Sequence, residues 1–112
     1  MISSDLVRAS LELVILSVVA EGPSYGYAIA KQIEASSDGA YPLKETTLYA
    51  AIRRLEQRGD LLASPGLESA GRPRTYYELT DAGRALLAER QTEWRSFVTT
   101  VTNITRSKGT ES

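Results

Sequence analysis

Residues 45–79 read ETTLYAAIRRLEQRGDLLASPGLESAGRPRTYYEL, and the spacing of their apolar residues changes partway from a helical to a strand pattern. In the first part, Leu48, Ile52 and Leu55 recur every three or four residues, which predicts a helix over about residues 45–58. The face opposite this apolar stripe carries arginine, hydroxyl and small side chains. We therefore expect a helix that is buried on one side and offers hydrogen-bond donors on the other.

The second part of this stretch predicts a β-hairpin. Residues 61–64 form a short apolar run, and residues 65–73 contain the glycines and prolines that are typical of a loop. Residues 74–79 alternate and are rich in strand-forming side chains. This arrangement places Arg72 and Arg74 near the tip of the predicted hairpin.

Three further helices are predicted outside this stretch. Apolar residues at helical spacing indicate a helix over about residues 5–20, and Ser24 is positioned to cap a second helix that runs to about Ser37. After the hairpin, Thr80 is positioned to cap a long helix over residues 80–105. The apolar residues of this last helix follow a heptad-like spacing, which is typical of a helix that packs on another helix.

Three helices, a hairpin and a helix follow one another in the order of a winged helix-turn-helix, a mainly α fold with a small β-hairpin. We assign residues 1–79 to the winged helix-turn-helix domain, residues 80–105 to a C-terminal dimerisation helix and residues 106–112 to a disordered tail. This fold binds DNA by placing one amphipathic helix in the major groove. The cations of the hairpin tip are expected to reach the neighbouring phosphates of the DNA backbone.

The composition excludes several classes of chemistry. The 112 residues fit one small domain, contain no Cys and no His, and carry a formal net charge of -1. Most zinc sites, thiol nucleophiles and Ser-His-Asp triads are therefore excluded, and we expect no enzyme activity, no cofactor and no metal site. A chain without cysteine suits the reducing cytoplasm. The apolar run at residues 11–20 is too short to span a membrane, and it lacks the basic flank of a signal peptide.

Several short blocks resemble the PadR family of transcriptional regulators in both order and spacing. The blocks are Glu21-Gly22-Pro23, Gly26-Tyr27, Thr47-Leu48-Tyr49, Arg54-Leu55-Glu56 and GRPRTYYELTDAGR at residues 71–84. The resemblance covers about residues 11–101 and implies a bacterial homodimeric repressor of the short subgroup that has a single C-terminal helix. Two positions depart from the family pattern: Lys44-Glu45-Thr46 stands where a Ser-Pro-Gly-like sequence is usual, and Ala50 stands where proline is frequent.

The donor-rich helix face, the hairpin and the resemblance together predict a DNA-binding surface. Double-stranded DNA with an imperfect inverted repeat is the expected partner, because a two-fold dimer presents two such helices. The predicted DNA-binding residues are Tyr27, Lys44, Thr46, Thr47, Tyr49, Arg53, Arg54, Arg72 and Arg74. A plainer interpretation of the arginines is that they are solvated surface charges, and of the tyrosines that they are packing residues.

The last helix predicts a homodimer interface, because its apolar stripe exceeds what the rest of so small a domain can cover. The resemblance further implies a pocket at the dimer centre, where a planar aromatic effector stacks on Trp94. Simple packing between the two copies is the alternative. The predicted interface and ligand-binding residues are Leu11, Ile15, Leu87, Trp94, Phe97, Val98 and Val101.

Two functions of different classes stay open on these grounds. The first is a sequence-specific DNA-binding repressor, and the second is a winged-helix module that only associates with other proteins. An enzyme built on carboxylates is a distant third. Salt-sensitive binding to duplex DNA separates the first two, because counterion release accompanies phosphate contacts.

Overall fold

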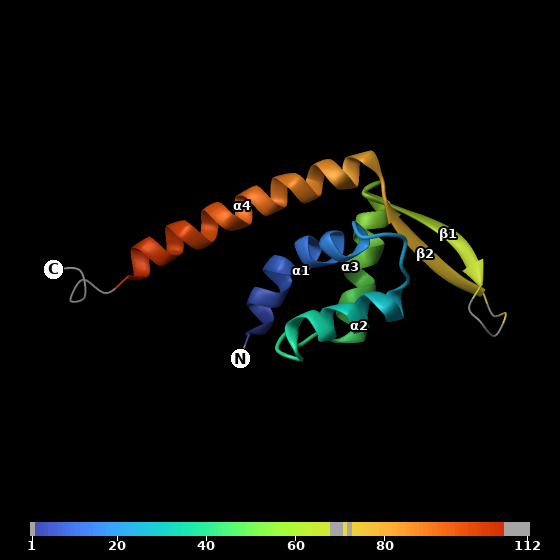
Figure 1. Ribbon diagram of the computed structural model, residues 1–112, viewed down its shortest axis with the longest axis horizontal. Helices are drawn as coiled ribbons and strands as arrows, with labels where there is room; N and C mark the ends of the chain where they lie inside the picture. The colour runs from blue at the N-terminus through green and yellow to red at the C-terminus, as the bar shows by residue number, and fades with distance from the viewer. Residues whose placement is uncertain (1, 68–70, 72, 107–112) are drawn as a thin grey trace.

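The computed structural model describes residues 2–67, 71 and 73–106. The elements follow in the order α1 (Ser4–Val19), α2 (Gly26–Ser37), α3 (Glu45–Gln57), β1 (Leu61–Leu67), β2 (Pro73–Leu79) and α4 (Asp81–Thr105). Helices α1 to α3 gather in the middle of the molecule, the hairpin projects to one side, and α4 runs away to the other (Figure 1). The resulting molecule is elongated, with extents of 64 × 29 × 20 Å. The predicted order and class of fold are confirmed.

The core lies where α1, α2 and α3 meet. The predicted stripe of α3 is fully buried, with Leu48, Ile52 and Leu55 at most 1% exposed. Helix α1 contributes Ile15 and Leu16, both 0% exposed, because its apolar residues recur at helical spacing. Burial of each such side chain stabilises the fold by about 1.5–3 kcal/mol. The core therefore holds α3 by one face and leaves the opposite face for solvent.

The start of α2 differs from the sequence-based prediction. Ser24 does not cap this helix; Tyr25 occupies the N-cap position, and its side chain makes no capping hydrogen bond within the described residues. Ser24 instead pairs with Tyr77 of β2, through two backbone hydrogen bonds of 2.9 and 2.7 Å. Because this pairing keeps Ser24 extended, the helix begins later and its first turn is fixed to the hairpin.

The hairpin is an antiparallel pair in which Leu67 lies opposite Pro73. Both strands are longer than predicted, because residues 65–67 belong to β1 and Pro73 belongs to β2 rather than to the loop. A two-stranded sheet has an open edge on each strand, so a proline without an N–H is accommodated there. The wing, which we define as β1, β2 and their connection, therefore extends further from the core than the sequence indicated.

Helix α4 begins in tight contact with the turn between α3 and β1. Thr80 caps it as predicted, because the Thr80 hydroxyl accepts the N–H of Gly83 at 3.0 Å and donates to the carbonyl of Gly59 at 2.6 Å. A Cβ placed on Gly83 would lie 2.1 Å from the carbonyl oxygen of Asp60. Only glycine lets the first turn of α4 approach that backbone.

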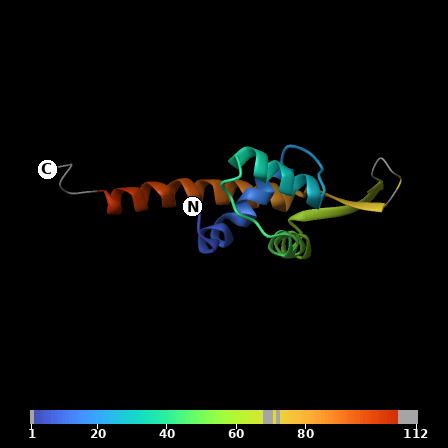
Figure 2. The same cartoon turned by 90° about the horizontal axis from the view of Figure 1, so that it is seen from below.

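The far half of α4 has no cover within the described chain. Leu86 and Leu87 pack on the core, whereas every residue from 95 to 105 is exposed. In Figure 2 this half of the helix extends alone beyond the three-helix core. Among the described residues, no helix is both long and apolar enough to span a membrane.

Candidate nucleic-acid interface

The outer face of α3 is uncovered. Figure 2 shows α3 end-on, with α1 and α2 on one side of it and nothing on the other. Thr46, Arg53 and Gln57 are exposed there, at the positions opposite the buried stripe. Since the core fixes the inner face, this row of side chains is held on a rigid element. Its diameter and its donors suit a helix that enters the major groove.

Each end of α3 carries one charge of the sign that stabilises a helix, although the N-cap residue itself does not. Lys44 is the exposed N-cap residue, and Glu45 in the first turn meets the positive end of the helix dipole. Arg54 lies in the last turn, where a cation is favoured. The poor N-cap at Lys44 is therefore partly offset by Glu45.

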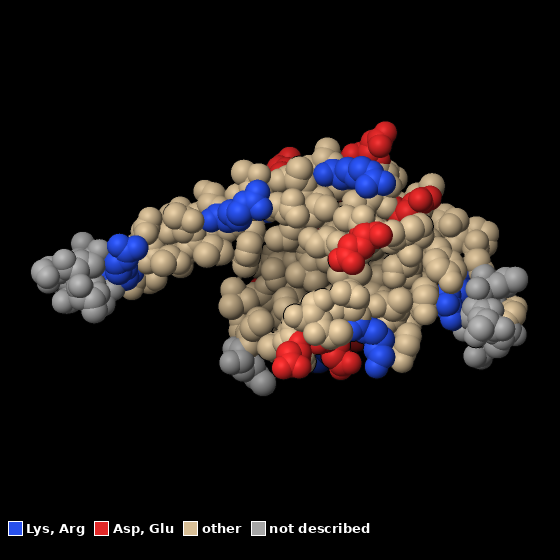
Figure 3. Space-filling model, viewed as in Figure 1, with Lys and Arg blue, Asp and Glu red and all other residues tan. Residues whose placement is uncertain are grey.

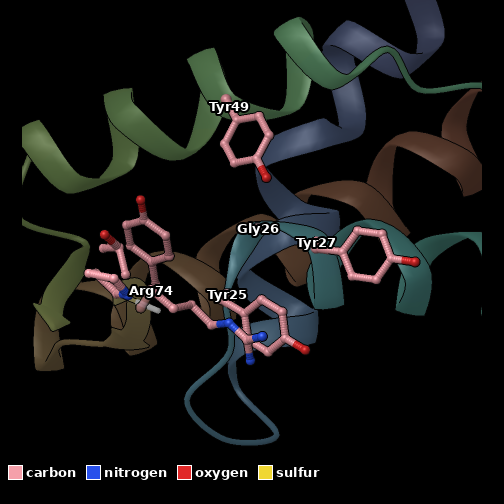
Figure 4. A pocket seen from close by; sticks show the side chains of 8 residues that line it. Tyr25, Gly26, Tyr27, Tyr49 and Arg74 are labelled. Atoms are coloured by element: carbon pink, nitrogen blue, oxygen red, sulfur yellow. The ribbon is translucent and has the colours of Figure 1, made fainter. Parts of the chain in front are cut away.

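A tyrosine notch lies between the start of α2, the face of α3 and strand β2 (Figure 4). Its volume is about 520 Å³. The lining residues, which define the notch, are Tyr25, Gly26, Tyr27, Tyr49, Pro73, Arg74, Thr75 and Tyr77. The structure thereby brings together Tyr27, Tyr49 and Arg74, which the sequence predicted as DNA-binding residues on three separate elements.

Each tyrosine of the notch has a distinct setting. In Figure 4 Tyr49 points from α3 toward the start of α2, and Tyr27 points outward from α2. Tyr27 is 63% exposed, whereas Tyr77 is half-buried. A tyrosine hydroxyl is protonated and able to donate at neutral pH, and burial raises the pKa of Tyr77 further above that range.

Gly26 is required by this arrangement. A Cβ at this position would lie 2.2 Å from the ring of Tyr49. The absence of a side chain lets the tyrosine ring rest against the first turn of α2, whose backbone N–H groups form the positive end of that helix. The Gly26-Tyr27 pair of the sequence therefore has a physical reason, since the glycine admits Tyr49 and the next residue presents a hydroxyl to solvent.

Of the two cations predicted for the wing, Arg74 lies among the residues that the structure describes. Its guanidinium carbon lies 3.7 Å from the centre of the Tyr25 ring, and its Nη1 donates to the Tyr76 hydroxyl at 3.3 Å. Arg72, the second predicted wing cation, lies outside the described residues. Tyr49 of α3 lines the notch, so the notch adjoins this helix, and Arg74 forms part of the same lining.

Glu12 and Arg58 form a contact that the sequence analysis missed. Arg58 donates to both carboxylate oxygens of Glu12, at 3.2 and 2.8 Å, and to Asp60 at 3.3 Å. Arg54 lies 3.8 Å from the same carboxylate and remains 55% exposed. The hydrogen bond from Arg58 is the largest cause that lowers the pKa of Glu12. This network joins α1 to the end of α3 and keeps Arg54 at the edge of the exposed face.

Arg8 is a second residue that the sequence analysis missed. It lines a small hollow with Thr46, Thr47 and Arg54, although it belongs to α1. Arg8 forms an exposed ion pair with Asp5. Its place beside α3 could not be read from spacing along the chain, because it depends on how α1 crosses α3.

The charges elsewhere on the molecule are mixed. In the view of Figure 3, acidic and basic side chains are interspersed over the visible face. This agrees with the formal net charge of -1. An affinity for nucleic acid would therefore depend on the local cations around α3 and the wing.

A second hollow lies between α1 and α4, with a volume of about 650 Å³. We call it the α1–α4 groove; its lining residues are Arg8, Ala9, Glu12, Leu13, Arg90, Glu93, Trp94 and Phe97. The Trp94 and Phe97 rings lie 5.9 Å apart, with Trp94 half-buried and Phe97 51% exposed.

The predicted interface residues divide into two groups. Phe97, Val98 and Val101 are exposed along α4, as a surface for a partner requires. Leu11 and Ile15 are 1% and 0% exposed, so their prediction as interface or ligand-binding residues is corrected. They belong to the core, because that face of α1 packs on α2 and α3 of the same chain. Leu87 also packs against the core.

Known proteins resemble this chain in both sequence and fold. The sequence profile of the transcriptional regulator PadR-like family matches residues 15–89. A solved transcriptional regulator from Clostridium thermocellum is 39% identical with a TM-score of 0.84, over 96% of this chain and 100% of that one. A solved PadR family transcriptional regulator from Eggerthella lenta is 33% identical with a TM-score of 0.80, over 93% of this chain and 88% of that one.

A further relative, an uncharacterized protein X from Lysinibacillus sphaericus, is 38% identical over 84% of this chain and 86% of its own length. These matches extend through the helices, the wing and α4 rather than through one motif. The family consists of regulators rather than enzymes. The chain therefore belongs to the PadR-like family of transcriptional regulators, whose members bind DNA.

Proposed function

We propose that this protein is a homodimeric repressor that binds an imperfect inverted repeat in duplex DNA. The observation that carries the proposal is the exposed face of α3 with the tyrosine notch beside it, in whose lining Arg74 lies. In this proposal α3 enters the major groove. The wing follows the flanking backbone.

Side chains take two kinds of role in the proposed complex. Thr46 and Arg53 face the base edges because they are exposed on the outer side of α3, and the half-buried Thr47 borders them. Tyr27, Tyr49, Lys44, Arg54, Arg72 and Arg74 contact phosphates, which fix the register of the protein on the duplex without reading its sequence. The hydroxyl of Tyr27 and the guanidinium of Arg74 come from the two sides of the notch.

The exposed part of α4 supports the proposed second copy. Phe97 is 51% exposed, Val98 44% and Ile104 75%, and a row of exposed apolar residues marks an interface. A two-fold dimer would hold its two copies of α3 about one turn of DNA apart, which is roughly 34 Å, or a whole multiple of that distance. The operator is therefore expected to be an inverted repeat.

Selection of bound genomic fragments, followed by footprinting, tests this function. We expect two protected half-sites related by two-fold symmetry. Protection of one isolated, asymmetric half-site would contradict the dimeric arrangement. Failure to retain any fragment at low salt would favour a module that associates only with proteins.

The double variant Arg72→Ala, Arg74→Ala tests the role of the wing. Loss of two phosphate contacts should weaken binding to all sequences and flatten the plot of log K against log salt by about two units. Arg84→Ala is the matched control, because Arg84 is an exposed arginine of α4 outside the notch and the α3 face. An unchanged slope in the double variant would remove the wing from the DNA contacts.

We also propose that a planar aromatic effector binds at Trp94 and releases the repressor from DNA. The α1–α4 groove supports this, because Trp94 and Phe97 form part of its wall beside the exposed half of α4. Trp94 is the sole tryptophan of the chain, so its fluorescence reports on this place. Planar cationic dyes should quench the Trp94 fluorescence saturably. A bound dye should lower the affinity of the protein for DNA, and bound DNA should lower its affinity for the dye by the same factor. An absence of saturable quenching across a panel of such dyes would leave Trp94 as a packing residue.

A further inference from the structure

Tyr25 makes a contact that none of the roles described above uses. The guanidinium carbon of Arg74 lies 3.7 Å from the centre of its ring, well inside the distance of about 6 Å at which a cation and an aromatic face attract. Figure 4 shows the Arg74 side chain reaching from β2 across the Tyr25 ring. Two residues 49 positions apart in the sequence are thereby joined at the mouth of the tyrosine notch.

A second ring completes the contact. Tyr76 packs edge-on against Tyr25, with ring centres 5.4 Å apart and an interplanar angle of 69°. The hydroxyl of Tyr76 accepts a hydrogen bond from Nη1 of Arg74 at 3.3 Å. The arginine therefore contacts one ring through its face and the other through a hydroxyl, which restricts its rotamers.

The backbone that carries Tyr25 is itself fixed. Ser24 exchanges two backbone hydrogen bonds with Tyr77, and the carbonyl of Tyr25 accepts the N–H of Ile29, which is 0% exposed, at 2.9 Å. The Tyr25 ring thus projects from a point held both by the hairpin and by the first turn of α2. Its position does not depend on the wing tip.

We propose that Tyr25 is a positioning residue for DNA binding, whose ring holds the Arg74 guanidinium beside the notch before DNA arrives. This inference rests on the proposed DNA-binding function. An ordered arginine loses less rotamer freedom on contact with a phosphate than a mobile one. A guanidinium stacked on a ring can also exchange its in-plane hydrogen-bond partners without leaving the ring.

A purely structural role for Tyr25 would have different consequences. If the half-buried ring only supported the domain, its removal would weaken DNA binding whether or not Arg74 were present. If the ring acts through Arg74, its effect vanishes once Arg74 is gone. The two roles are therefore separable by a double-mutant cycle.

The test uses Tyr25→Leu and Tyr25→Phe in the full chain, each alone and combined with Arg74→Ala. Tyr25→Leu should weaken binding to a selected operator fragment about three- to fivefold, as loss of a cation–π contact at a partly exposed site predicts. The slope of log K against log salt should stay unchanged, because Arg74 still reaches its phosphate. Tyr25→Phe keeps the ring and should bind within about twofold of the wild type, since a phenylalanine ring also holds a cation.

Arg74→Ala alone should flatten the salt slope by about one unit, and adding Tyr25→Leu should then change nothing. Equal weakening by Tyr25→Leu with and without Arg74 would overturn the proposal in favour of a structural role. Wild-type affinity in Tyr25→Leu would overturn it as well. The titration of the wild type with DNA separately tests the proposed function. Failure of the DNA-binding proposal is therefore distinguishable from failure of the role proposed for Tyr25.

A measurement without DNA gives an independent readout. In the nuclear magnetic resonance spectrum, the side-chain protons of Arg74 should be shifted upfield by the ring current of Tyr25 in the wild type and in Tyr25→Phe. Most of this shift should be lost in Tyr25→Leu, where only the Tyr76 ring at 5.9 Å remains, while the amide spectrum of the core is retained. Random-coil shifts for Arg74 in the wild type would contradict the inference.

Discussion

The three-helix core and the far half of α4 both follow a helical apolar pattern, yet only the core is covered. Leu16 in α1 and Leu55 in α3 are 0% exposed, whereas Phe97 and Ile104 in α4 are 51% and 75% exposed. The difference lies in the neighbours and not in the residues themselves. Helices α1, α2 and α3 cover one another, but α4 passes beyond the end of the domain (Figure 1). An apolar stripe predicts which face of a helix is buried but does not identify what buries it.

The comparison separates two kinds of stability. The core should hold each protomer together by itself, and α4 should contribute mainly through a second copy. Substitutions in the two regions should therefore affect different measurements.

The largest expected effect is that of Leu55→Ala. Leu55 is 0% exposed in the core, and truncation of a buried leucine costs about 2–5 kcal/mol through lost burial and the remaining cavity. Urea unfolding should show this loss directly. Val98→Ala on exposed α4 is the matched control, and in dilute protomers we expect it to cost less than about 0.5 kcal/mol. Similar losses in both variants would show that the far half of α4 is packed within the protomer.

The second effect concerns the assembly. Phe97→Asp places a charge in the exposed apolar row of α4, where pairing with a second copy would bury it without a partner. Light scattering should then report the protomer mass of 12.2 kDa, and twice that mass for the wild type. Thr99→Asp, on the opposite side of the helix, should leave the dimer intact. A wild-type protein that scatters as a monomer would contradict the distinction between the two regions.

The smallest effect concerns the carboxylate that ties α1 to α3. The pKa of Glu12 is lowered in the folded state, chiefly by the hydrogen bond from Arg58. A lowered pKa contributes stability that is present above the unfolded-state value and is lost as pH falls through the folded-state value. At neutral pH, Glu12→Gln should therefore cost about 1 kcal/mol or less, because Arg58 is 46% exposed and solvent screens the pair.

The pH series supplies the check on Glu12. The difference in unfolding free energy between wild type and Glu12→Gln should be constant above about pH 6 and should shrink in acid as the wild-type carboxyl becomes protonated. Glu89→Gln, which removes a carboxylate that is 70% exposed, should show a smaller difference throughout. A loss in Glu12→Gln that is equal at acid and neutral pH would mean that the ion pair does not cause it.

The helices and strands could be predicted from the sequence, because each depends mainly on residues that lie close together along the chain. The spacing of Leu48, Ile52 and Leu55 gave the buried face of α3, and Thr80 caps α4 as its side chain predicts. Ser24 was wrongly predicted as a cap, because a strand far along the chain pairs with its backbone. The prediction that Ile15 lies at an interface was wrong for a related reason. The spacing of apolar residues shows that one face of a helix is buried, but it does not show which neighbouring element covers that face.

The site was predictable only in part for the same reason. Tyr27, Tyr49 and Arg74 were recognised from short blocks of sequence, and the structure brings them to one notch. The contacts of Tyr25 with Arg74 and of Glu12 with Arg58 join residues far apart along the chain, so no spacing rule could indicate them. Such pairs become visible only once the crossing of the helices and the placement of the wing are known.

The most direct test of the central claim is the salt dependence of binding between the wild-type chain and a fragment selected from genomic DNA. If the α3 face, the notch and the wing form a DNA-binding surface, affinity should fall steeply and linearly on logarithmic axes between about 50 and 200 mM salt, because each phosphate contact releases counterions. Affinity that does not depend on salt, or no binding at the lowest salt, would contradict the account.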